Sequence, residues 1–302
     1  MENTKTRSAF ISIVGKPNVG KSSLLNCLLG EKIAIVTNKP QTTRTKITGV
    51  LTKGETQFVF IDTPGFHKAK TKLSDSMIKA VNTSIRDVDA VMLVVEPTGK
   101  LTEAELNLIN NIKNQNIARI LIINKIDLVQ DKTRIADRIM ELTKLCEFDA
   151  VIPISVQNND GIDRVFLEID KCAEEGVHFF PDDTLTDQPE RVIVAEMIRE
   201  KILMNLHQEI PHGTAVVIES MKEREDKEIL DIDAMIYCEK DSHKGMIIGK
   251  HGAVLKRIAS TAREEIEGFL DIKVNLKCWI KVREDWRNKD SMIRNFGLSN
   301  QE

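Results

Sequence analysis

The sequence lacks the features of a membrane protein and of a disulfide-linked secreted domain. No apolar run approaches the roughly 20 residues of a membrane-spanning helix, and the first nine residues lack the apolar core of a signal peptide. The five cysteines are scattered and never spaced as Cys-x-x-Cys, which argues against a disulfide framework or a zinc site. We therefore expect a cytoplasmic protein whose cysteines are small buried apolar residues.

The 302 residues suit two domains, and their net charge of −3 is close to balanced. We predict a first domain over 1–177, a linker over 178–190 and a second domain over 191–302. In the first domain, apolar strand-like runs alternate with helical patterns, which favours a mostly parallel sheet covered by helices on both faces. A hairpin around Lys53-Gly54 would add one antiparallel edge strand. Two prolines enclose the acidic linker.

The pattern changes after the linker to helix, two strands, two helices around a Gly-x-x-Gly turn, and a last strand. This order predicts a compact α+β module. We expect the charged stretch 222–228 to form the loop between the first two strands, and either Trp279 or Ile280 to face the core from the last one. For both Trp279 and Trp286, core packing is preferred over stacking on nucleic-acid bases.

Residues 15–22 form a Gly-x4-Gly-Lys-Ser loop directly after an apolar strand-like run. In such a loop the backbone amides surround an anion, the lysine reaches the outer phosphates and the serine hydroxyl ligates Mg²⁺. We expect the phosphates to contact Gly15, Asn18, Val19, Gly20, Lys21, Ser22, Ser23 and Gly65.

An acidic segment and a threonine-containing segment are expected to complete the magnesium site and to respond to the nucleotide. Asp62 ends the next strand-like run and is predicted to hold Mg²⁺ together with Ser22 and Thr43. Thr43 is preferred over Thr42 as the threonine that closes over the metal. The first responsive segment, switch I, comprises Gln41, Thr42, Thr43 and Arg44, and switch II comprises Asp62, Thr63, Pro64, Gly65 and Phe66.

The element Asn124-Lys125-Ile126-Asp127 selects the base. A carboxylate only accepts hydrogen bonds, so Asp127 matches the two donors on the guanine edge, which adenine lacks. Asn124 is expected to contact the base, Lys125 to lie along it, and Ser155 and Val156 to approach it from the following strand end. A phosphate-loop kinase or ATPase is the alternative that this element disfavours.

The second domain carries a local basic patch although its overall charge is slightly acidic. Between 240 and 263 there is one acidic residue, Asp241, against six basic ones: Lys240, Lys244, Lys250, Lys256, Arg257 and Arg263. A Gly-x-x-Gly turn in this setting favours single-stranded RNA. The predicted contacts are Ile248, Gly249, Lys250, His251, Gly252, Lys256 and Arg257. A protein- or membrane-binding module remains the alternative.

Taken together, these motifs resemble those of the bacterial Era GTPases over almost the whole chain. The resemblance extends through 186–191 and 247–252. It implies a Ras-like phosphate-loop GTPase domain followed by a type II KH domain, GTP or GDP with Mg²⁺ as ligands, and K⁺ held with the help of Asn18. It further implies a monomeric assembly factor that binds the 3′ end of 16S rRNA and the small ribosomal subunit, in the cytoplasm and at the inner face of the membrane.

The chain departs from the family pattern at Glu96, where Asp is common, and at Ser155-Val156, where Ser-Ala is common. Ras-like enzymes position the attacking water with a glutamine directly after Asp-x-x-Gly, whereas this chain has Phe66, so slow intrinsic hydrolysis is expected. Arg44 is a remote candidate for an arginine finger within the chain.

Overall fold

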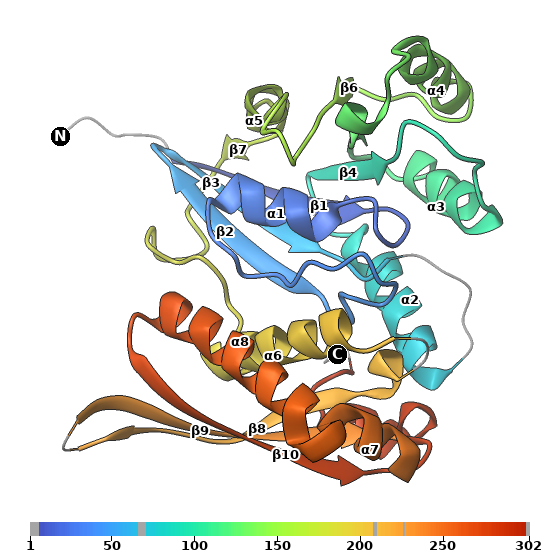
Figure 1. Ribbon diagram of the computed structural model, residues 1–302. Helices are drawn as coiled ribbons and strands as arrows, with labels where there is room; N and C mark the ends of the chain where they lie inside the picture. The colour runs from blue at the N-terminus through green and yellow to red at the C-terminus, as the bar shows by residue number, and fades with distance from the viewer. Residues whose placement is uncertain (1–5, 66–70, 208–209, 226, 300–302) are drawn as a thin grey trace, which may run out of the picture.

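The computed structural model describes residues 6–65, 71–207, 210–225 and 227–299. Phe66, assigned to switch II from the sequence, lies outside these ranges. Figure 1 shows the chain as two bodies, with the early strands and helices α1 to α5 in one and the segments from α6 onward in the other.

The first body contains a mostly parallel sheet with strand order β2-β3-β1-β4-β5-β6, and a short β7 pairs antiparallel with β1. Its strands are β1 (Arg7–Val14), β2 (Ile47–Lys53), β3 (Thr56–Asp62), β4 (Ala90–Val95), β5 (Ala118–Ile123), β6 (Ala150–Pro153) and β7 (Glu174–Glu175). The predicted edge hairpin is confirmed, since β2 pairs antiparallel with β3 around Gly54.

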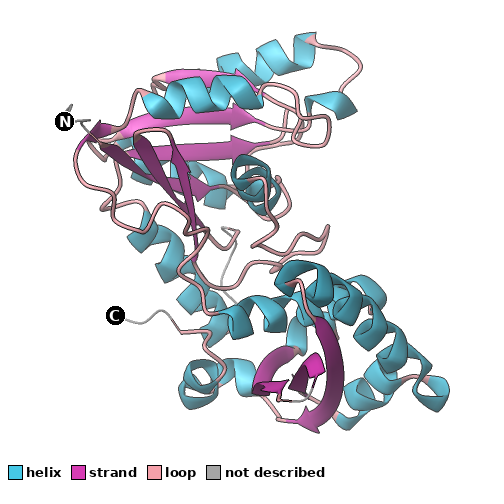
Figure 2. Cartoon of the chain, turned by 90° about the vertical axis from the view of Figure 1, so that its left-hand side faces the viewer, coloured by secondary structure: helices cyan, strands magenta, loops and turns pink. Residues whose placement is uncertain are grey.

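Helices cover both faces of this sheet, as Figure 2 also shows. They are α1 (Lys21–Leu29), α2 (Lys72–Ser84), α3 (Glu103–Lys113), α4 (Thr133–Thr143) and α5 (Ile162–Asp170). Buried residues of α1 and α5 share one apolar cluster, and those of α3, α4 and the end of α2 contribute to a second. The start of α2 packs instead in a small cluster with Trp286 and Ile293. Strand β4 alternates between the two clusters, because neighbouring side chains of a strand point to opposite faces. Because β3, β1, β4, β5 and β6 are parallel, their carboxyl-terminal ends lie along the same edge of the sheet.

The segment after β7 runs along the first sheet and is tied to it. The Gln57 carboxamide accepts hydrogen bonds from the backbone N–H groups of Phe179 (2.8 Å) and Phe180 (3.0 Å). Further along, Val50 N–H donates to the Leu185 carbonyl at 2.8 Å. The predicted linker therefore follows a fixed path.

The second body is a three-stranded sheet with order β10-β9-β8, in which β8 and β9 are antiparallel and β9 and β10 parallel. Its elements are α6 (Glu190–Asn205), β8 (Ala215–Arg224), β9 (Lys227–Cys238), α7 (Asp241–Ile248), α8 (Ala253–Leu270), β10 (Lys273–Val282) and α9 (Asp290–Asn295). Single 3-10 turns occur at η1 (Ile126–Leu128), η2 (Pro211–Gly213), η3 (Lys250–Gly252) and η4 (Trp286–Asn288). The predicted α+β order is confirmed.

Two details of the second body differ from the sequence predictions. The expected loop 222–228 is shorter, because the ladder continues to Arg224↔Lys227 and Arg224 pairs with Asp231 at 2.7 Å. Trp286 packs in the core with no exposed surface, as predicted, but Trp279 is 58% exposed. Its neighbour Ile280 takes the core-facing position, since alternation along β10 places the tryptophan on the opposite face.

The five cysteines are free thiols. Cys146 and Cys238 are buried as predicted, whereas the other three are only half-buried. Burial raises the pKa of the Cys278 thiol to about 11. None of the helices in the described ranges combines the length and apolar character needed to cross a bilayer.

Candidate nucleotide site and RNA-binding surface

The phosphate loop connects β1 to α1 and depends on an unusual backbone. Gly20 has a φ of 101°, and a Cβ there would lie 2.2 Å from the Asn124 amide nitrogen, so only glycine fits. Helix α1 begins directly afterwards without a side-chain hydrogen bond at its N-cap. The first N–H groups of the helix are thus directed at the loop, which is the arrangement that binds phosphate.

Lys21 lies under this loop and is almost fully buried, at 5% exposed. Its ammonium group donates to the carbonyls of Gly15 (3.1 Å) and Lys16 (3.0 Å). Burial lowers the pKa of Lys21 to about 8, and the nearby Asp62 carboxylate acts in the opposite direction. An anion in the loop would stabilise the charged lysine further, as expected for a phosphate ligand.

Three oxygen-bearing side chains converge beside Lys21. The Ser22 hydroxyl lies 2.9 Å from the Thr43 hydroxyl and donates to Asp62 Oδ2 at 2.6 Å. Asp62 is fully buried, and its Oδ1 has no hydrogen-bond partner within the described part of the chain. Burial raises the pKa of Asp62 to about 6, against the opposing charge of Lys21. A hard cation such as Mg²⁺ suits this oxygen set and the unpaired buried oxygen.

The two threonines of switch I lie in different surroundings. Thr43 is buried next to Ser22, whereas the Thr42 hydroxyl is hydrogen-bonded to Thr37 (2.7 Å) and to the Lys39 carbonyl (2.7 Å). The geometry thus favours Thr43 as the metal ligand, and the assignment stays a prediction. In switch II, the Thr63 hydroxyl donates to the Ile13 carbonyl at 2.9 Å.

The residues predicted to select the base form a connected set at the ends of β5 and β6. The exposed Asp127 accepts a 2.6 Å hydrogen bond from the Ser155 hydroxyl, which orients its carboxylate. Asn124 donates to the Val19 carbonyl (2.9 Å) and accepts from Val156 N–H (3.2 Å). Asn124 therefore joins the phosphate loop to the base loop, and one amide hydrogen remains for the predicted base contact. The sequence did not indicate this contact between the Ser155 hydroxyl and Asp127.

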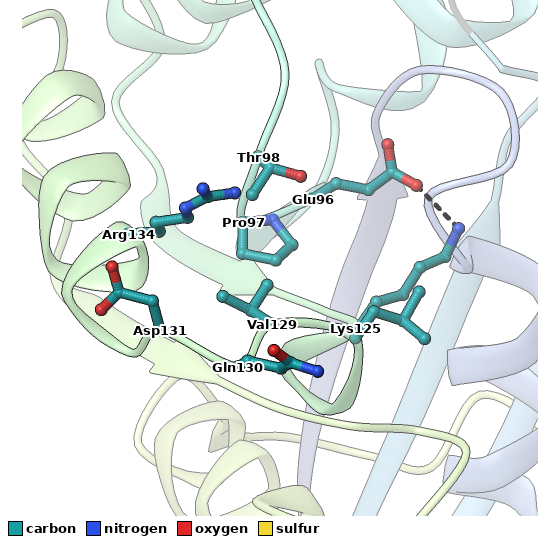
Figure 3. Close-up of a pocket in the computed structure, with 9 residues that line it drawn as sticks. Glu96, Pro97, Thr98, Lys125, Val129, Gln130, Asp131 and Arg134 are labelled. Atoms are coloured by element: carbon teal, nitrogen blue, oxygen red, sulfur yellow. Dashed lines mark hydrogen bonds and ion pairs between the residues drawn. The ribbon is translucent and has the colours of Figure 1, made fainter.

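The departure at Glu96 has a structural role. Its carboxylate pairs with Lys125 at 2.7 Å and with Lys16 at 3.1 Å. Partial burial raises the pKa of Glu96, but the hydrogen bonds from the two lysines outweigh this effect and leave it below its ordinary value. Figure 3 shows this pair at one end of a pocket. The longer glutamate thus holds the lysine that is expected to lie along the base.

Two pockets share Lys125 as a wall. One, of about 390 Å³, lies between the loops after β4 and β5 and is the one drawn in Figure 3. The other, of about 230 Å³, is lined by the phosphate loop and switch I, including Lys21, Ser22 and Thr43. Although it is smaller, the second pocket is the one lined by the residues predicted to contact the phosphates and the metal.

Switch I is fastened to the second body by two buried arginines. Arg44 donates to the carbonyls of Thr214 (2.6 Å) and His212 (2.8 Å), and Arg199 of α6 donates to those of Gln41 and Thr42. Burial, with repulsion from Arg199, lowers the pKa of Arg44 to about 9. In this arrangement the Arg44 guanidinium is hydrogen-bonded to the second body, so it does not serve as an arginine finger.

A carboxylate on the same helix contacts the chain just before switch I. Glu200, which is fully buried, accepts from Val36 N–H at 2.8 Å and pairs with Lys32 at 2.7 Å. Switch I and the residues before it are therefore enclosed between the phosphate loop and α6. Their sequence gave no sign of these contacts.

The Gly-x-x-Gly turn follows α7 directly. Gly249 has a φ of 73°, and a Cβ there would lie 2.4 Å from Val254 Cγ2. Ile248 is half-buried, and four basic side chains are exposed on the turn and the first turns of α8: Lys250, His251, Lys256 and Arg257. The predicted RNA contacts are thus brought together on one surface, with an apolar residue at its base.

Comparison with known protein families agrees with both the phosphate-loop domain and the domain that carries the Gly-x-x-Gly turn. Residues 10–125 match the family described as 50S ribosome-binding GTPase, and residues 209–287 match the KH domain. The GTPase Era of Ruminiclostridium cellulolyticum is 50% identical over 291 residues, which covers 96% of this chain and 97% of the relative. The chain belongs to the GTPase Era family. It is thus a GTP-hydrolysing enzyme with a Ras-like domain followed by a KH domain.

Other relatives support the same conclusion. The GTPase Era of Clostridioides difficile is 48% identical over 293 residues, covering 97% of this chain and 99% of the relative. A variant of Aquifex aeolicus Era bound to GDP·AlF4⁻ has a TM-score of 0.93 at 36% identity, covering 97% of this chain and all of that one. An Era crystallised with MgGDPNP and nucleotides 1506–1542 of 16S ribosomal RNA has the same TM-score and identity, covering 97% and 99%.

Proposed function

We propose that this Era-family GTPase acts as a nucleotide-dependent switch that binds the 3′ end of 16S rRNA and assists assembly of the small (30S) ribosomal subunit. The observation that carries the proposal is the pairing of a complete nucleotide site with an exposed basic Gly-x-x-Gly turn in one chain. The Era crystallised with MgGDPNP and nucleotides 1506–1542 of 16S rRNA supports the choice of RNA. The protein-docking alternative lacks comparable support.

The proposed roles of the site residues follow from their positions. The loop amides and Lys21 bind the phosphates, while Ser22, Thr43 and Asp62 hold Mg²⁺, which would neutralise charge on the phosphate oxygens. Asp127, oriented by Ser155, accepts the guanine donors. Together these groups position the nucleotide.

The domain limits that we propose are 1–177 for the GTPase domain, 178–190 for the linker and 191–302 for the KH domain. The protein would work as a monomer in the cytoplasm, with a fraction at the inner face of the membrane. The Era resemblance supports these assignments. Sedimentation and cell fractionation test them.

The central experiment is a filter-binding titration of the full chain against single-stranded RNA ending in the small-subunit 3′ sequence. Each titration is run with GDP and with a non-hydrolysable GTP analogue, and a scrambled RNA is the control. We expect tighter binding to the correct RNA and a difference between the nucleotides. Equal binding to both RNAs under all conditions would overturn the proposal.

A further inference from the structure

The outer face of the KH sheet carries an exposed tryptophan among lysines. Along β10, Val274, Cys278 and Ile280 pack toward the helices. The alternate positions therefore share the opposite face. Trp279 lies on that face and is 58% exposed. Lys277 and Lys281, two residues to either side, are exposed as well. In Figure 1, helices α6 and α8 lie between this sheet and the GTPase domain.

Trp279 is one end of an apolar row that crosses the three strands. It is in register with Met235 of β9, which is in register with Val217 of β8. Both are half-buried, and we call these three residues the Trp279 strip. In the next row, Tyr237 stacks on Phe296 at a centroid distance of 4.5 Å. The C-terminal segment therefore covers the neighbouring row and leaves Trp279 open.

The charges beside the strip favour an anionic partner. Lys277 and Lys281 form no ion pair with any carboxylate of the described residues. Asp233 is in register with Lys277 and offsets part of its charge. Two further carboxylates near this face already have partners, since Asp231 is engaged by Arg224 at 2.7 Å and Glu219 accepts a hydrogen bond from the Tyr237 hydroxyl at 3.4 Å. Positive charge thus remains on both sides of the ring along β10.

The position of β10 connects this face to the Gly-x-x-Gly turn. Strand β10 is an edge strand of the sheet, and it contacts α7, the helix that ends at the turn. A chain held at the turn can therefore pass the open edge of β10 and reach the outer face. Among the strands in the described ranges, only β9 pairs with β10.

We propose that the Trp279 strip is a second RNA-binding surface, on which an unpaired base stacks against Trp279 while Lys277 and Lys281 neutralise the adjoining phosphates. A protein partner fits less well, because charged residues are depleted in the cores of protein interfaces. The inference rests on the proposed RNA-binding function and extends the contact beyond the nucleotides at the turn.

Tryptophan fluorescence provides a direct test. The chain has two tryptophans, and Trp286 is fully buried, so Trp279 is the one that stacking would quench. We expect RNA extended on both sides of the turn-binding sequence to quench the fluorescence, and RNA of about four nucleotides, which the turn alone clamps, to leave it unchanged. Trp279→Phe should abolish the quenching but retain most of the affinity.

Affinity measurements complete the test. Trp279→Ala should weaken binding of the extended RNA by roughly tenfold and leave the short RNA and GTP unaffected. The double variant Lys277→Gln/Lys281→Gln should bind the extended RNA with an affinity that depends less on salt concentration than that of the wild type. If Trp279→Ala binds the extended RNA as tightly as the wild type and its fluorescence is quenched equally, while a variant of the Gly-x-x-Gly turn loses RNA binding, this inference is overturned. The proposed function would then still stand. Unchanged RNA affinity with weaker binding to the small subunit would identify a protein contact instead. Failure of the wild type to bind either RNA would remove the proposed function as well.

Discussion

The guanidinium group of Arg44 donates a 2.6 Å hydrogen bond to the backbone carbonyl of Thr214, which joins switch I to the KH domain. The same group lies 5.8 Å from the centre of the Trp286 ring. Arg199 donates hydrogen bonds to the carbonyls of Gln41 and Thr42. Thr43 therefore lies between two anchored positions, Thr42 and Arg44. The KH domain therefore fixes the segment that carries a predicted magnesium ligand of the other domain.

Replacing Arg199 should weaken binding of the triphosphate more than that of the diphosphate. Arg199→Met removes the donors to Gln41 and Thr42 but keeps a long apolar side chain in a buried position. Because hydrogen bonds of a charged donor contribute about 1.5–3 kcal/mol, we expect the Kd for a magnesium-bound GTP analogue to rise at least about tenfold. Calorimetric titration measures this, with the exposed Arg191→Gln on the same helix as the matched control. Equal losses for GDP and the analogue would contradict the linkage.

Thr43 and Thr42 form a natural pair of tests for the magnesium assignment. Thr43→Ala should weaken magnesium-dependent GTP binding by about tenfold or more, because an oxygen ligand is lost. Thr42→Ala removes contacts to Thr37 and Lys39 within the loop and should change the same affinity much less. Magnesium titrations at fixed nucleotide measure both. The opposite ranking would reassign the ligand to Thr42.

Guanine specificity should depend on Asp127. Asp127→Asn places an amide where a carboxylate faces two donors, so GTP affinity should fall by at least about tenfold while xanthosine triphosphate binds better. Ser155→Ala removes only the 2.6 Å bond that orients the carboxylate, and we expect a smaller loss without a change of preference. Competition titrations with the two triphosphates measure the preference. An unchanged preference in Asp127→Asn would refute the assignment.

RNA affinity should depend on charge at the turn. Lys250→Asp combined with His251→Asp places two negative charges on exposed positions, and Asp tolerates the left-handed backbone of residue 251. Binding should weaken, and the loss of one phosphate contact should reduce the salt slope by about one. Lys222→Glu with Lys227→Gln, exposed at the far hairpin, changes the net charge by the same amount and is the control. GTP affinity should stay normal, and equal effects of both variants would argue against a specific site.

Intrinsic hydrolysis should be slow and should respond to potassium. Asn18 donates to the Asn38 carbonyl at 2.8 Å, which leaves its amide oxygen for a monovalent cation near the phosphates. We expect phosphate release to be faster in potassium than in sodium, and Asn18→Ala to remove the difference. RNA or the ribosomal subunit should accelerate turnover further. Fast turnover of the isolated protein in sodium buffer would contradict this prediction.

The sequence by itself determined the two-domain architecture, because its signals are local. Alternating strand and helix patterns gave the parallel sheet, and turn glycines such as Gly20 and Gly249 have backbone angles that side chains disfavour. The capping box at the start of α3 is equally local, because Thr102 and Glu105 are only three residues apart. Family membership followed from motifs of contiguous residues.

Only the tertiary structure decided the relationships between distant residues. Alternation along β10 makes Trp279 and Ile280 face opposite sides of the sheet. Which of the two faces the core depends on how the strand packs against α7 and α8, and the structure turns Ile280 inward. Likewise, Arg44 is one polar residue in a polar segment until the fold brings the Thr214 carbonyl to it. Such contacts join residues about 170 positions apart, and no local pattern encodes them, because their energy arises only once both domains are folded and in place.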